Sequence, residues 1–285
     1  MIESAIAKAQ VLTEALPYIR KFQGRMVVIK YGGSLMADDK LKPIFASDIA
    51  LLKQVGIHPV VVHGGGKEIN HWLKKIGKES LFIEGLRYTD NETMELTEMV
   101  LSGKINSEVV DILNSSGCKA IGLSGKDAQL FMAEKIKAKS GEDLGQVGDI
   151  SETDVTLIHQ LCHSGYVPVI SSIARSSAGE TLNLNADYVA AGVAGALRAL
   201  KLVYLTDVDG IMVGGKLVQT MTLSEAEELL KSPEISGGMV PKLECAIRGA
   251  KAGVSSVHII SGSREHAVLL EMFTDLGVGT MITGN

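Results

Sequence analysis

Cysteine and proline are scarce in this chain, which has three cysteines and six prolines among 285 residues. The cysteines are odd in number and far apart, which argues against a disulfide framework or a cysteine-rich zinc site and favours a reducing compartment. The low proline count argues against a proline-rich disordered chain. No apolar run approaches the length of about 18 residues that a transmembrane helix needs, and no basic segment of a signal peptide opens the sequence. We therefore expect a cytoplasmic protein with no membrane partner.

Positive charge is in slight deficit, with 28 Lys and Arg against 33 Asp and Glu, for a formal net charge of −5. This mildly acidic balance gives no general attraction to nucleic acid or to an anionic membrane. An anionic ligand would therefore have to be held by local groups. Glycine is in excess, with 31 residues, and the chain length suits one large domain or two lobes that share a sheet.

Short runs of β-branched and other apolar residues predict buried strands, and stretches with helical spacing separate them. The predicted strands are 26–30, 57–62, 166–170, 202–205 and 257–260. The predicted helices are an N-terminal helix and residues 44–55, 67–77, 91–115, 152–164, 186–199, 223–231, 240–252 and 265–274. Strands that alternate with helices indicate an α/β fold with a mainly parallel sheet. The segment 127–150 lacks long helical periodicity, so we expect a hairpin there.

Four glycine clusters follow a predicted strand or open a predicted helix. They are Gly32–Gly33, Gly64–Gly66, Gly210 with Gly214–Gly215, and Gly237–Gly238. Ligands of a parallel sheet bind at the carboxyl ends of the strands, where glycine lets backbone amides approach an anion closely. Any one cluster taken alone favours a simple turn. Two of them directly follow strands, which favours an anion site.

The motifs of several common enzyme classes are missing. G-x-x-x-x-G-K-[ST] and G-x-G-x-x-G do not occur, which excludes a P-loop and disfavours a dinucleotide dehydrogenase. No G-x-S-x-G elbow indicates a Ser-His-Asp triad. His159 and His163 have i, i+4 spacing, but the glutamate of a zinc motif and a third ligand are lacking. We interpret them as an ordinary helix face and expect no protein-bound metal.

Two lysines and one aspartate stand at predicted junctions between strands, loops and helices. Lys30 ends a buried strand, and Lys242 follows Pro241, which can start a helix. A lysine in the first turn of a helix opposes the macrodipole unless an anion is also present. Asp187 lies at a further junction. Surface lysines and a helix-capping aspartate are the alternatives.

Six motifs occur in order along the chain. They are Lys30-Tyr-Gly-Gly-Ser34, Val61-Val-His-Gly-Gly-Gly66, Gly85-Leu-Arg-Tyr-Thr-Asp90, Leu182-Asn-Leu-Asn-Ala-Asp187, Leu205-Thr-Asp-Val208 and Gly237-Gly-Met-Val-Pro-Lys242. Together they resemble the acetylglutamate kinases of the amino acid kinase superfamily. The resemblance implies a three-layer αβα sandwich with an oligomerisation helix at 1–24, an acetylglutamate-binding lobe at 25–199 and an ATP-binding lobe at 200–285.

The resemblance also implies an activity, the ATP-dependent phosphorylation of the γ-carboxylate of N-acetyl-L-glutamate in the second step of arginine biosynthesis. Mg²⁺ would be carried with ATP. A glutamate-type carboxylate has a pKa of about 4.3, so the acceptor is already ionised at neutral pH and needs no general base.

The family's site residues carry over to matching positions of this sequence. Lys30 and Lys242 would stabilise the transferring phosphoryl group, and Asp187 would hold both ammonium groups in place. The substrate would lie against Gly64, Gly65, Arg87 and Asn183. The nucleotide would lie against Gly32, Gly33, Thr206, Asp207, Gly210, Gly238 and Met239.

Both ends of the chain imply regulation through the same resemblance. The N-terminal helix, with Glu14-Ala-Leu-Pro-Tyr-Ile-Arg20, is similar to the extension that joins dimers of arginine-inhibited members into a hexamer. The segment that begins at His266 is similar to the part that binds L-arginine there, with roles for His266, Glu271 and Gly277. For Glu271, a solvated helix face is the alternative.

Two departures from the family pattern change local charge. Ser261-Gly262-Ser263 replaces a family motif that contains an acid, close to the implied arginine site. Lys67-Glu68 follows the substrate glycines in place of the usual proline and glutamine.

Two other functions remain as alternatives. A sister kinase acting on glutamate, aspartate or carbamate would share the glycine motifs, although Arg87 with Asn183 favours an acylated amino acid. A non-catalytic arginine sensor could keep the fold, but it would not need Lys30, Asp187 and Lys242 together.

Overall fold

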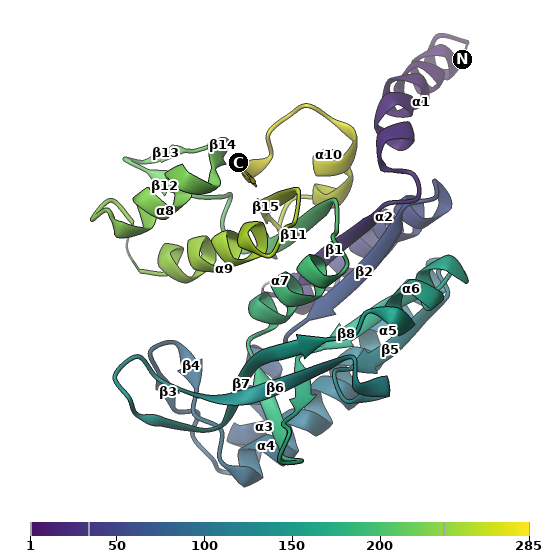
Figure 1. Cartoon of the computed structure of the whole chain (residues 1–285). Coiled ribbons are helices and arrows are strands. Elements are labelled where there is room, and N and C mark those ends of the chain that lie inside the picture. Colours follow the sequence, from purple (N-terminus) through teal and green to yellow (C-terminus); the bar gives the residue numbers. More distant parts are fainter. Residues whose placement is uncertain (1, 34, 236, 285) are drawn as a thin grey trace.

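A sheet of eight strands forms the centre of the molecule in the computed structural model, which describes residues 2–33, 35–235 and 237–284 (Figure 1). The strands are β1 Met26–Tyr31, β2 His58–His63, β5 Ala120–Ser124, β8 Val167–Ser171, β11 Lys201–Thr206, β14 Thr220–Thr222, β15 Ser256–Ser261 and β16 Gly279–Thr283. They lie in the order β14–β16–β15–β11–β1–β2–β8–β5, and only β14 and β16 run against the others. The predicted α/β class is confirmed. Ser34, part of one predicted motif, lies outside the described residues.

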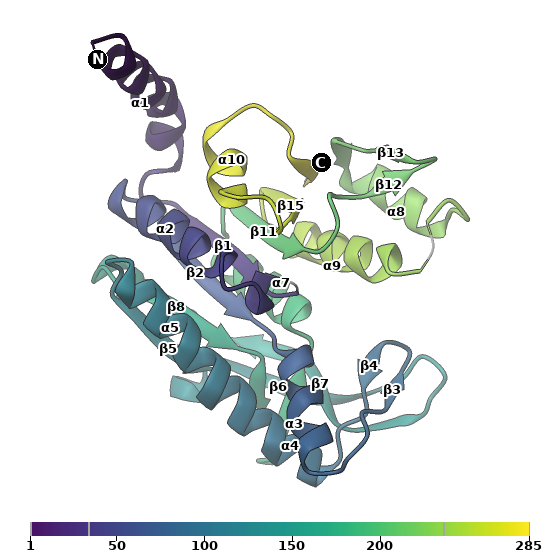
Figure 2. The same ribbon diagram turned by 180° about the vertical axis from the view of Figure 1, so that it is seen from behind.

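Helices cover both faces of this sheet. They are α1 Ile2–Phe22, α2 Leu41–Gln54, α3 Gly66–Lys75, α4 Asn91–Glu98, α5 Asn106–Ser115, α6 Thr156–His163, α7 Ala186–Ala196, α8 Leu223–Lys231, α9 Met239–Lys251 and α10 Ala267–Phe273. Neighbouring residues of β1 point to opposite faces, so Val28 packs in the core with α6, α7 and α9, whereas Val27 and Ile29 pack with α2, α5 and α10. Figure 1 looks onto the first helical layer and Figure 2 onto the second. A strand buried on both faces explains the continuous apolar runs of the sequence.

A small closed sheet lies beside the main one. Its strands are β6 Phe131–Lys137, β7 Asp143–Thr153, β9 Ile173–Arg175 and β10 Thr181–Leu184. β6 and β7 pair antiparallel, which confirms the hairpin expected within 127–150. Two shorter hairpins join β3 (Phe82–Ile83) to β4 (Leu86–Arg87), and β12 (Met212–Val213) to β13 (Lys216–Leu217).

Two of the predicted helices differ from the structure. Glu152, expected in a helix, pairs with Met132 at the end of β7, and α6 begins only at Thr156. Pairing with a distant strand outweighs the local helical spacing here. The helix predicted for 91–115 is divided into α4 and α5 by the π-helical segment η2 (Met99–Ile105). A π-helical segment has one more residue per hydrogen-bonded turn, so it shifts which residues face the sheet.

A buried polar pair fastens the end of β2 to the start of α5. His63 has no exposed surface; its Nδ1 bonds to the Gly64 carbonyl at 3.1 Å, and its Nε2 lies 3.0 Å from Asn106 Nδ2. Asn106 Nδ2 also lies 3.0 Å from the Val169 carbonyl of β8. Burial lowers the pKa of His63 to about 4, so the ring is neutral at pH 7, with Nε2 as the acceptor for Asn106.

Helix α1 extends away from the rest of the molecule and contacts it mainly through α10 (Figures 1 and 2). Its apolar residues Ile2, Val11 and Leu12 are 77%, 64% and 72% exposed. No helix within the described residues combines the length and the apolar character needed to cross a membrane.

The carboxyl ends of the parallel strands meet at one edge of the main sheet. β1 ends close to Lys30, β2 runs into the glycines before α3, and β11 runs into Thr206 and Asp207. The N-termini of α3 and α7 lie at the same edge, because their first residues line a common cavity with Lys30. The fold therefore gathers three of the predicted motifs at one place.

Gly249 allows α9 to approach the sheet closely. A Cβ added at this position would lie 2.8 Å from Leu202 Cδ2 and 3.2 Å from Val257 Cγ2. We expect Gly249→Ala to lower the free energy of unfolding by about 1–3 kcal/mol, because the added carbon overpacks this contact. The control Gly103→Ala adds a carbon where no atom lies within 4 Å and should not destabilise the protein. Urea unfolding of both variants tests this, and equal stability of the two would contradict it.

The buried His63 predicts a loss of stability in acid. The unfolded chain takes up a proton on this ring near its ordinary pKa of 6.5, whereas the folded chain does so only near a pKa of about 4. The unfolded state therefore binds more protons between these values, and stability falls as the pH drops from 6.5 to 4, by about 3 kcal/mol from this group. Urea unfolding at several pH values should show this slope in the wild type and a flatter one in His63→Gln. The exposed His71→Gln variant is the control, and a His63→Gln slope as steep as that of the wild type would contradict the assignment.

Candidate active site

An ion pair between Lys30 and Asp187 joins β1 to the first turn of α7. Lys30 Nζ lies 2.9 Å from Asp187 Oδ1, and the two side chains are 15% and 31% exposed. Asn185 caps α7 by accepting a hydrogen bond from the Asp187 amide at 2.8 Å, which fixes where the helix begins. The predicted pairing of these two residues is therefore present, and Asp187 is an ion-pair partner in addition to belonging to a helix start.

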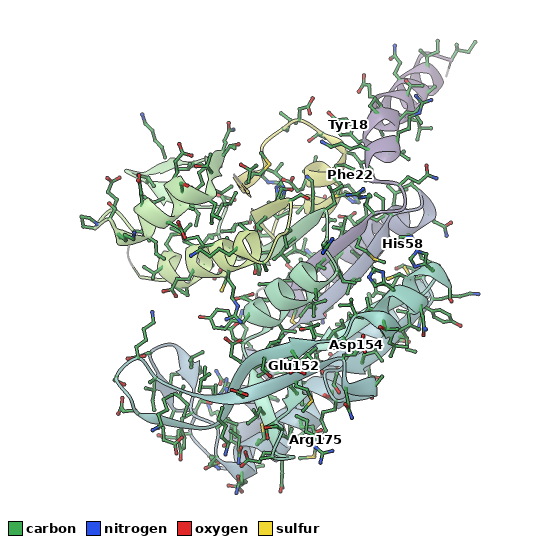
Figure 3. All side chains as sticks on the ribbon, in the orientation of Figure 1. Tyr18, Phe22, His58, Glu152, Asp154 and Arg175 are labelled. Carbon is green, nitrogen blue, oxygen red and sulfur yellow. The ribbon has the colours of Figure 1, made fainter. Side chains whose placement is uncertain are left out.

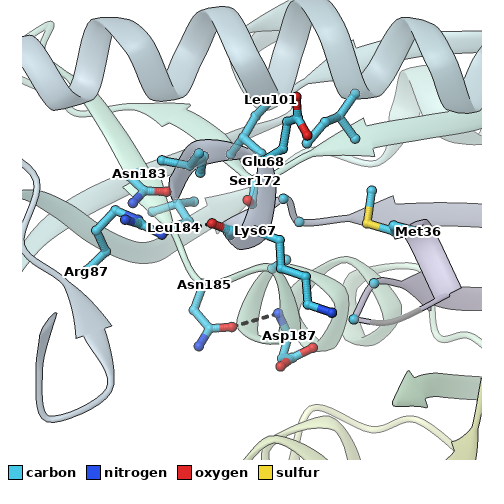
Figure 4. A pocket seen from close by; sticks show the side chains of 18 of the residues that line it. Met36, Lys67, Glu68, Arg87, Leu101, Ser172, Asn183, Leu184, Asn185 and Asp187 are labelled. Carbon is cyan, nitrogen blue, oxygen red and sulfur yellow. Dashed lines mark hydrogen bonds between the residues drawn. The ribbon is translucent and has the colours of Figure 1, made fainter. Parts of the chain in front are cut away.

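The larger cavity of the site has a volume of about 420 Å³, enough for a small metabolite. Its lining includes Lys30, Asp187 and all four predicted substrate residues: Gly64, Gly65, Arg87 and Asn183. Figure 4 shows Arg87, Asn183 and Asp187 around this cavity. Asn183 Nδ2 donates to Thr89 Oγ1 at 3.2 Å, which orients the amide at the cavity wall. Gly32 and Gly33, predicted to contact the nucleotide, line this same cavity.

Arg87 is a buried cation held by neutral groups. It is 8% exposed, and its guanidinium donates to Ser80 Oγ at 2.8 Å and to the Gly66 carbonyl at 3.1 Å, while it stacks 4.7 Å from the Phe82 ring centre. Burial lowers the pKa of Arg87, and within the described residues no carboxylate lies within 4 Å of it. A buried positive charge without a counter-ion suits an anionic ligand in this cavity.

Gly65 is required by packing. A Cβ on Gly65 would lie 2.1 Å from Ile105 Cδ1 and 2.7 Å from Leu101 Cδ2, so the π-helical segment η2 presses against the loop before α3. Gly65 is also the residue before the first turn of α3, and it lines the larger cavity together with Gly66 and Lys67 of that turn. Packing thus gives a reason for glycine at this position, and the anion-site interpretation stays a prediction.

A smaller cavity of about 110 Å³ opens on the other side of the Lys30–Asp187 pair. It is lined by Lys30, Asp187, Thr206, Asp207 and Lys242, among others. The two cavities thus share the ion pair, and Lys242, which belongs to α9, lines the smaller one. This arrangement brings together the three residues predicted to act on a transferred group.

The expected role of Asp187 for Lys242 is not what the structure shows. Lys242 Nζ bonds to Asp207 Oδ1 at 3.1 Å, whereas Asp187 is the partner of Lys30. Lys242 lies in the first turn of α9 and Asp207 directly follows β11, so the nearest carboxylate to Lys242 belongs to its own half of the sheet. This hydrogen bond from Lys242 lowers the pKa of Asp207.

Of the other residues predicted to contact the nucleotide, some line a cavity and one is packed inside the protein. Gly238 and Met239 line a third cavity of about 310 Å³ that also includes Lys242. Gly210 is packed inside the protein instead, because a Cβ there would lie 2.6 Å from Leu217 and 2.7 Å from Thr280. Its φ of +150° also favours glycine. Backbone conformation and packing within the chain are therefore enough to explain why glycine occupies this position.

Glu271 belongs to a buried charge network and not to a solvated helix face. Its Oε1 lies 2.8 Å from Lys201 Nζ and 2.8 Å from His258 Nδ1, and the side chain is 10% exposed. Burial alone would raise the pKa of Glu271, but His258 and Lys201 outweigh it and leave the pKa below its ordinary value. Lys201 also lies 5.3 Å from the Phe22 ring centre at the end of α1. Sequence reasoning missed Lys201 and His258, whose only signal was a charged or polar residue inside a buried strand.

The other two predicted regulatory residues flank α10. His266 precedes the helix, and its Nδ1 bonds to the buried Asp48 of α2 at 2.6 Å. Gly277 follows the helix and is exposed. Lys67 and Glu68, which depart from the family pattern, both line the larger cavity. Glu68 accepts from Trp72 Nε1 at 2.9 Å and lies 3.6 Å from Lys104 Nζ, whereas Lys67 has no ion pair within the described residues.

The paired histidines of α6 interact within their own helix. His163 Nδ1 bonds to the His159 carbonyl at 2.7 Å. Across residues 2–33, 35–235 and 237–284, no group of three or more His, Cys, Asp or Glu side chains could hold a metal ion, and all three cysteines are free and buried.

Comparison with known proteins supplies the family. The model of the amino acid kinase family matches residues 25–261. An acetylglutamate kinase of Syntrophus aciditrophicus (strain SB) is 50% identical over 289 residues, which cover 98% of this chain and 98% of that protein. Structures of an N-acetylglutamate synthase from Neisseria gonorrhoeae, complexed with coenzyme A and either N-acetyl-glutamate or L-arginine, match with TM-scores of 0.86 and 0.81 at 29% and 28% identity.

The extent of these matches differs. The alignments with the synthase structures cover 97% and 96% of this chain but only 63% and 65% of the synthase, so the chain spans less than two thirds of that protein. The kinase relative, in contrast, is matched over nearly its whole length. On the strength of the family model and of this full-length relative, the chain belongs to the amino acid kinase family.

Proposed function

We propose that the protein transfers the γ-phosphoryl group of ATP to the γ-carboxylate of N-acetyl-L-glutamate, the second step of arginine biosynthesis. The observation that carries this proposal is the Lys30–Asp187 ion pair at the junction of two cavities, with Lys242 facing it from the other half of the sheet. The full-length relative at 50% identity is an acetylglutamate kinase, which supports this choice of reaction.

The larger cavity is the proposed acetylglutamate site. Arg87, a buried cation with no carboxylate partner among the described residues, would bind the α-carboxylate. Asn183 would hydrogen-bond the substrate, and Gly64 and Gly65 would offer backbone amides. The γ-carboxylate would then point toward Lys30, which lies on the same cavity wall.

The chemical difficulty is to bring one anion onto another. The acceptor carboxylate is ionised at neutral pH, so no general base is needed, and catalysis depends on positioning and charge stabilisation. Lys30 and Lys242 would approach the transferring phosphoryl group from opposite halves of the sheet. Their carboxylate partners, Asp187 and Asp207, would hold the two ammonium groups in place until the substrates bind.

ATP would occupy the side of Lys242, with residues 25–199 as the acetylglutamate lobe and 200–285 as the ATP lobe. Thr206 and Asp207 would border it in the smaller cavity, Gly238 and Met239 in the third cavity, and Gly32 and Gly33 near the phosphates. Mg²⁺ would enter with ATP and neutralise phosphate charge; it usually keeps several waters and binds through substrate phosphates. The nearby carboxylates Asp187 and Asp207 are each already paired with a lysine. This fits a magnesium ion that is held mainly by the phosphates of ATP.

Inhibition by L-arginine is the proposed regulation. The buried carboxylate of Glu271, with Lys201 and His258 beside it, lies near the end of α1 and would offer a negative group to the guanidinium of arginine. The related gonococcal synthase has been solved with L-arginine. The exposed apolar residues of α1, such as Val11 and Leu12, would be covered by another copy of the chain in a hexamer built as a trimer of dimers.

Substitution of Lys242 tests the proposed chemistry. We expect Lys242→Ala to lower kcat at least about 100-fold with an unchanged melting temperature, because one preorganised cation is lost from the transition state. Lys251→Ala, at the far end of the same helix, removes the same charge outside the site and should retain normal turnover. Near-normal turnover of Lys242→Ala would contradict the role of Lys242.

The acceptor is tested by trapping the acyl phosphate with hydroxylamine. Parallel assays with N-acetyl-L-glutamate, glutamate and aspartate as acceptors, each with MgATP, distinguish the proposed reaction from those of the sister amino acid kinases, and ADP formation with carbamate tests the carbamate kinase reaction. We expect hydroxamate only with the acetylated substrate. A preference for another acceptor would replace the proposed substrate, and no product with any acceptor would favour the arginine-sensor alternative.

Arginine inhibition is tested separately. Millimolar L-arginine should raise the KM for acetylglutamate or lower the rate in the wild type. Glu271→Gln should abolish this effect while the uninhibited rate remains, because the amide offers no charge to a guanidinium. An unchanged rate and acetylglutamate dependence of the wild type with arginine would contradict the proposed regulation.

A further inference from the structure

Tyr204 lies in the core directly below the junction of the two cavities. It belongs to β11, is 3% exposed, and packs in the core shared by α7 and α9. It also lines the smaller cavity, together with Lys30, Asp187 and Lys242. Its side chain therefore reaches the space between the two helices that carry Asp187 and Lys242.

The Tyr204 hydroxyl has two backbone acceptors, one on each of these helices. It lies 3.0 Å from the Asp187 carbonyl of α7 and 3.2 Å from the Cys245 carbonyl of α9. A phenol has a single hydrogen to donate, so this hydrogen is shared between the two carbonyls. Burial raises the pKa of Tyr204 well above its ordinary value, which keeps the hydroxyl protonated as a donor at neutral pH.

We propose that Tyr204 is a positioning residue, whose hydroxyl sets the separation between the Lys30–Asp187 pair and Lys242 by fastening the start of α7 to α9. This inference rests on the proposed phosphoryl transfer. Asp187 stands in the first turn of α7, and Cys245 follows Lys242 by three residues on α9, slightly less than one helical turn. A shift of α9 relative to α7 would therefore change the position of the Lys242 ammonium relative to Lys30.

A second attachment holds the later part of α9, whereas the Tyr204 hydroxyl bonds nearer its start, where Lys242 also bonds to Asp207 and Glu244 to Lys139, each at 3.1 Å. Arg248 donates to both carboxylate oxygens of Asp149 on β7, each at 2.7 Å, and its guanidinium lies 4.6 Å from the Tyr188 ring centre. The Tyr204 hydroxyl bonds to the carbonyl of Cys245, which lies about one helical turn closer to Lys242 than Arg248 does. With α9 fixed at Arg248, loss of the hydroxyl would free mainly the first turns of α9.

The consequence of misplacing Lys242 differs from that of losing a core contact. A core contact that merely stabilises the fold affects the amount of folded protein and leaves kcat of that protein unchanged. Misplacement of a group by about 1 Å can cost up to about 100-fold in the rate of a reaction that depends on geometry. N-acetyl-L-glutamate would still bind, since its proposed partners Arg87 and Asn183 are not part of α9.

The test uses Tyr204→Phe, which keeps the ring in the core and removes only the hydroxyl. We expect kcat with N-acetyl-L-glutamate and MgATP to fall by about 10-fold, while the KM for N-acetyl-L-glutamate stays within about 3-fold of the wild type. Tyr188→Phe, on α7, is the matched control. The Tyr188 hydroxyl has no hydrogen-bond partner within the described residues, so this variant should keep the wild-type kcat.

A double variant distinguishes positioning from a structural role. If Tyr204 acts through Lys242, Tyr204→Phe should cost nothing further in a protein that already carries Lys242→Ala. An equal fractional loss of kcat in both backgrounds would overturn the inference, as would a normal kcat in the Tyr204→Phe variant. Thermal melting of each variant verifies that the measured protein is folded.

Failure of this inference is separate from failure of the proposed function. If the wild type does not phosphorylate N-acetyl-L-glutamate, the proposed substrate is wrong, and the same variants are then compared on the acceptor that the hydroxamate assay identifies. If the wild type is active and Tyr204→Phe equals it, only the positioning role is overturned.

Discussion

The ion pair between Lys30 and Asp187 holds an ammonium group at the point where two cavities meet, and the rest of the site is arranged around that group. A protein with a net charge of −5 has to attract two anionic substrates and then bring their charges into contact. Cations placed at the binding site can attract and hold these anions even though the net charge of the protein is negative. Asp187 keeps the ammonium of Lys30 oriented, and the buried Arg87 supplies a second positive charge deeper in the larger cavity.

The parallel sheet makes this arrangement possible. The strands β1 and β11 are neighbours and end at the same edge, so the residues that follow them lie close together although they are distant in sequence. Helices α7 and α9 pack on one face of these strands and begin near that edge. Close packing of α9 through Gly249, and the hydrogen bond of Tyr204 to both helices, connect the core directly to the position of Lys242. Contacts that stabilise this half of the molecule are therefore also the ones we propose to position Lys242.

The glycine-rich loop after β2 also depends on buried groups that do not face the cavity. His63 bonds to the Gly64 carbonyl, and Asn106 ties His63 to β8. Gly65 lies against Ile105 of the π-helical segment, where a side chain would not fit. The loop whose backbone amides we propose to bind an anion is thus held from behind by a neutral polar pair and an apolar contact. This preorganisation keeps the reorganisation needed at the moment of reaction small.

The sequence by itself determined the α/β class, the five principal strands, the hairpin within 127–150 and the pairing of Lys30 with Asp187. It could do so because periodicity is local and the family motifs are ordered along the chain. Only the tertiary structure decided that Lys242 pairs with Asp207, that Glu271 is buried beside Lys201 and His258, and that Tyr204 bridges two helices. It also decided that Glu152 joins a strand. Each of these depends on which distant strand ends and helix faces become neighbours, and no local spacing contains that information.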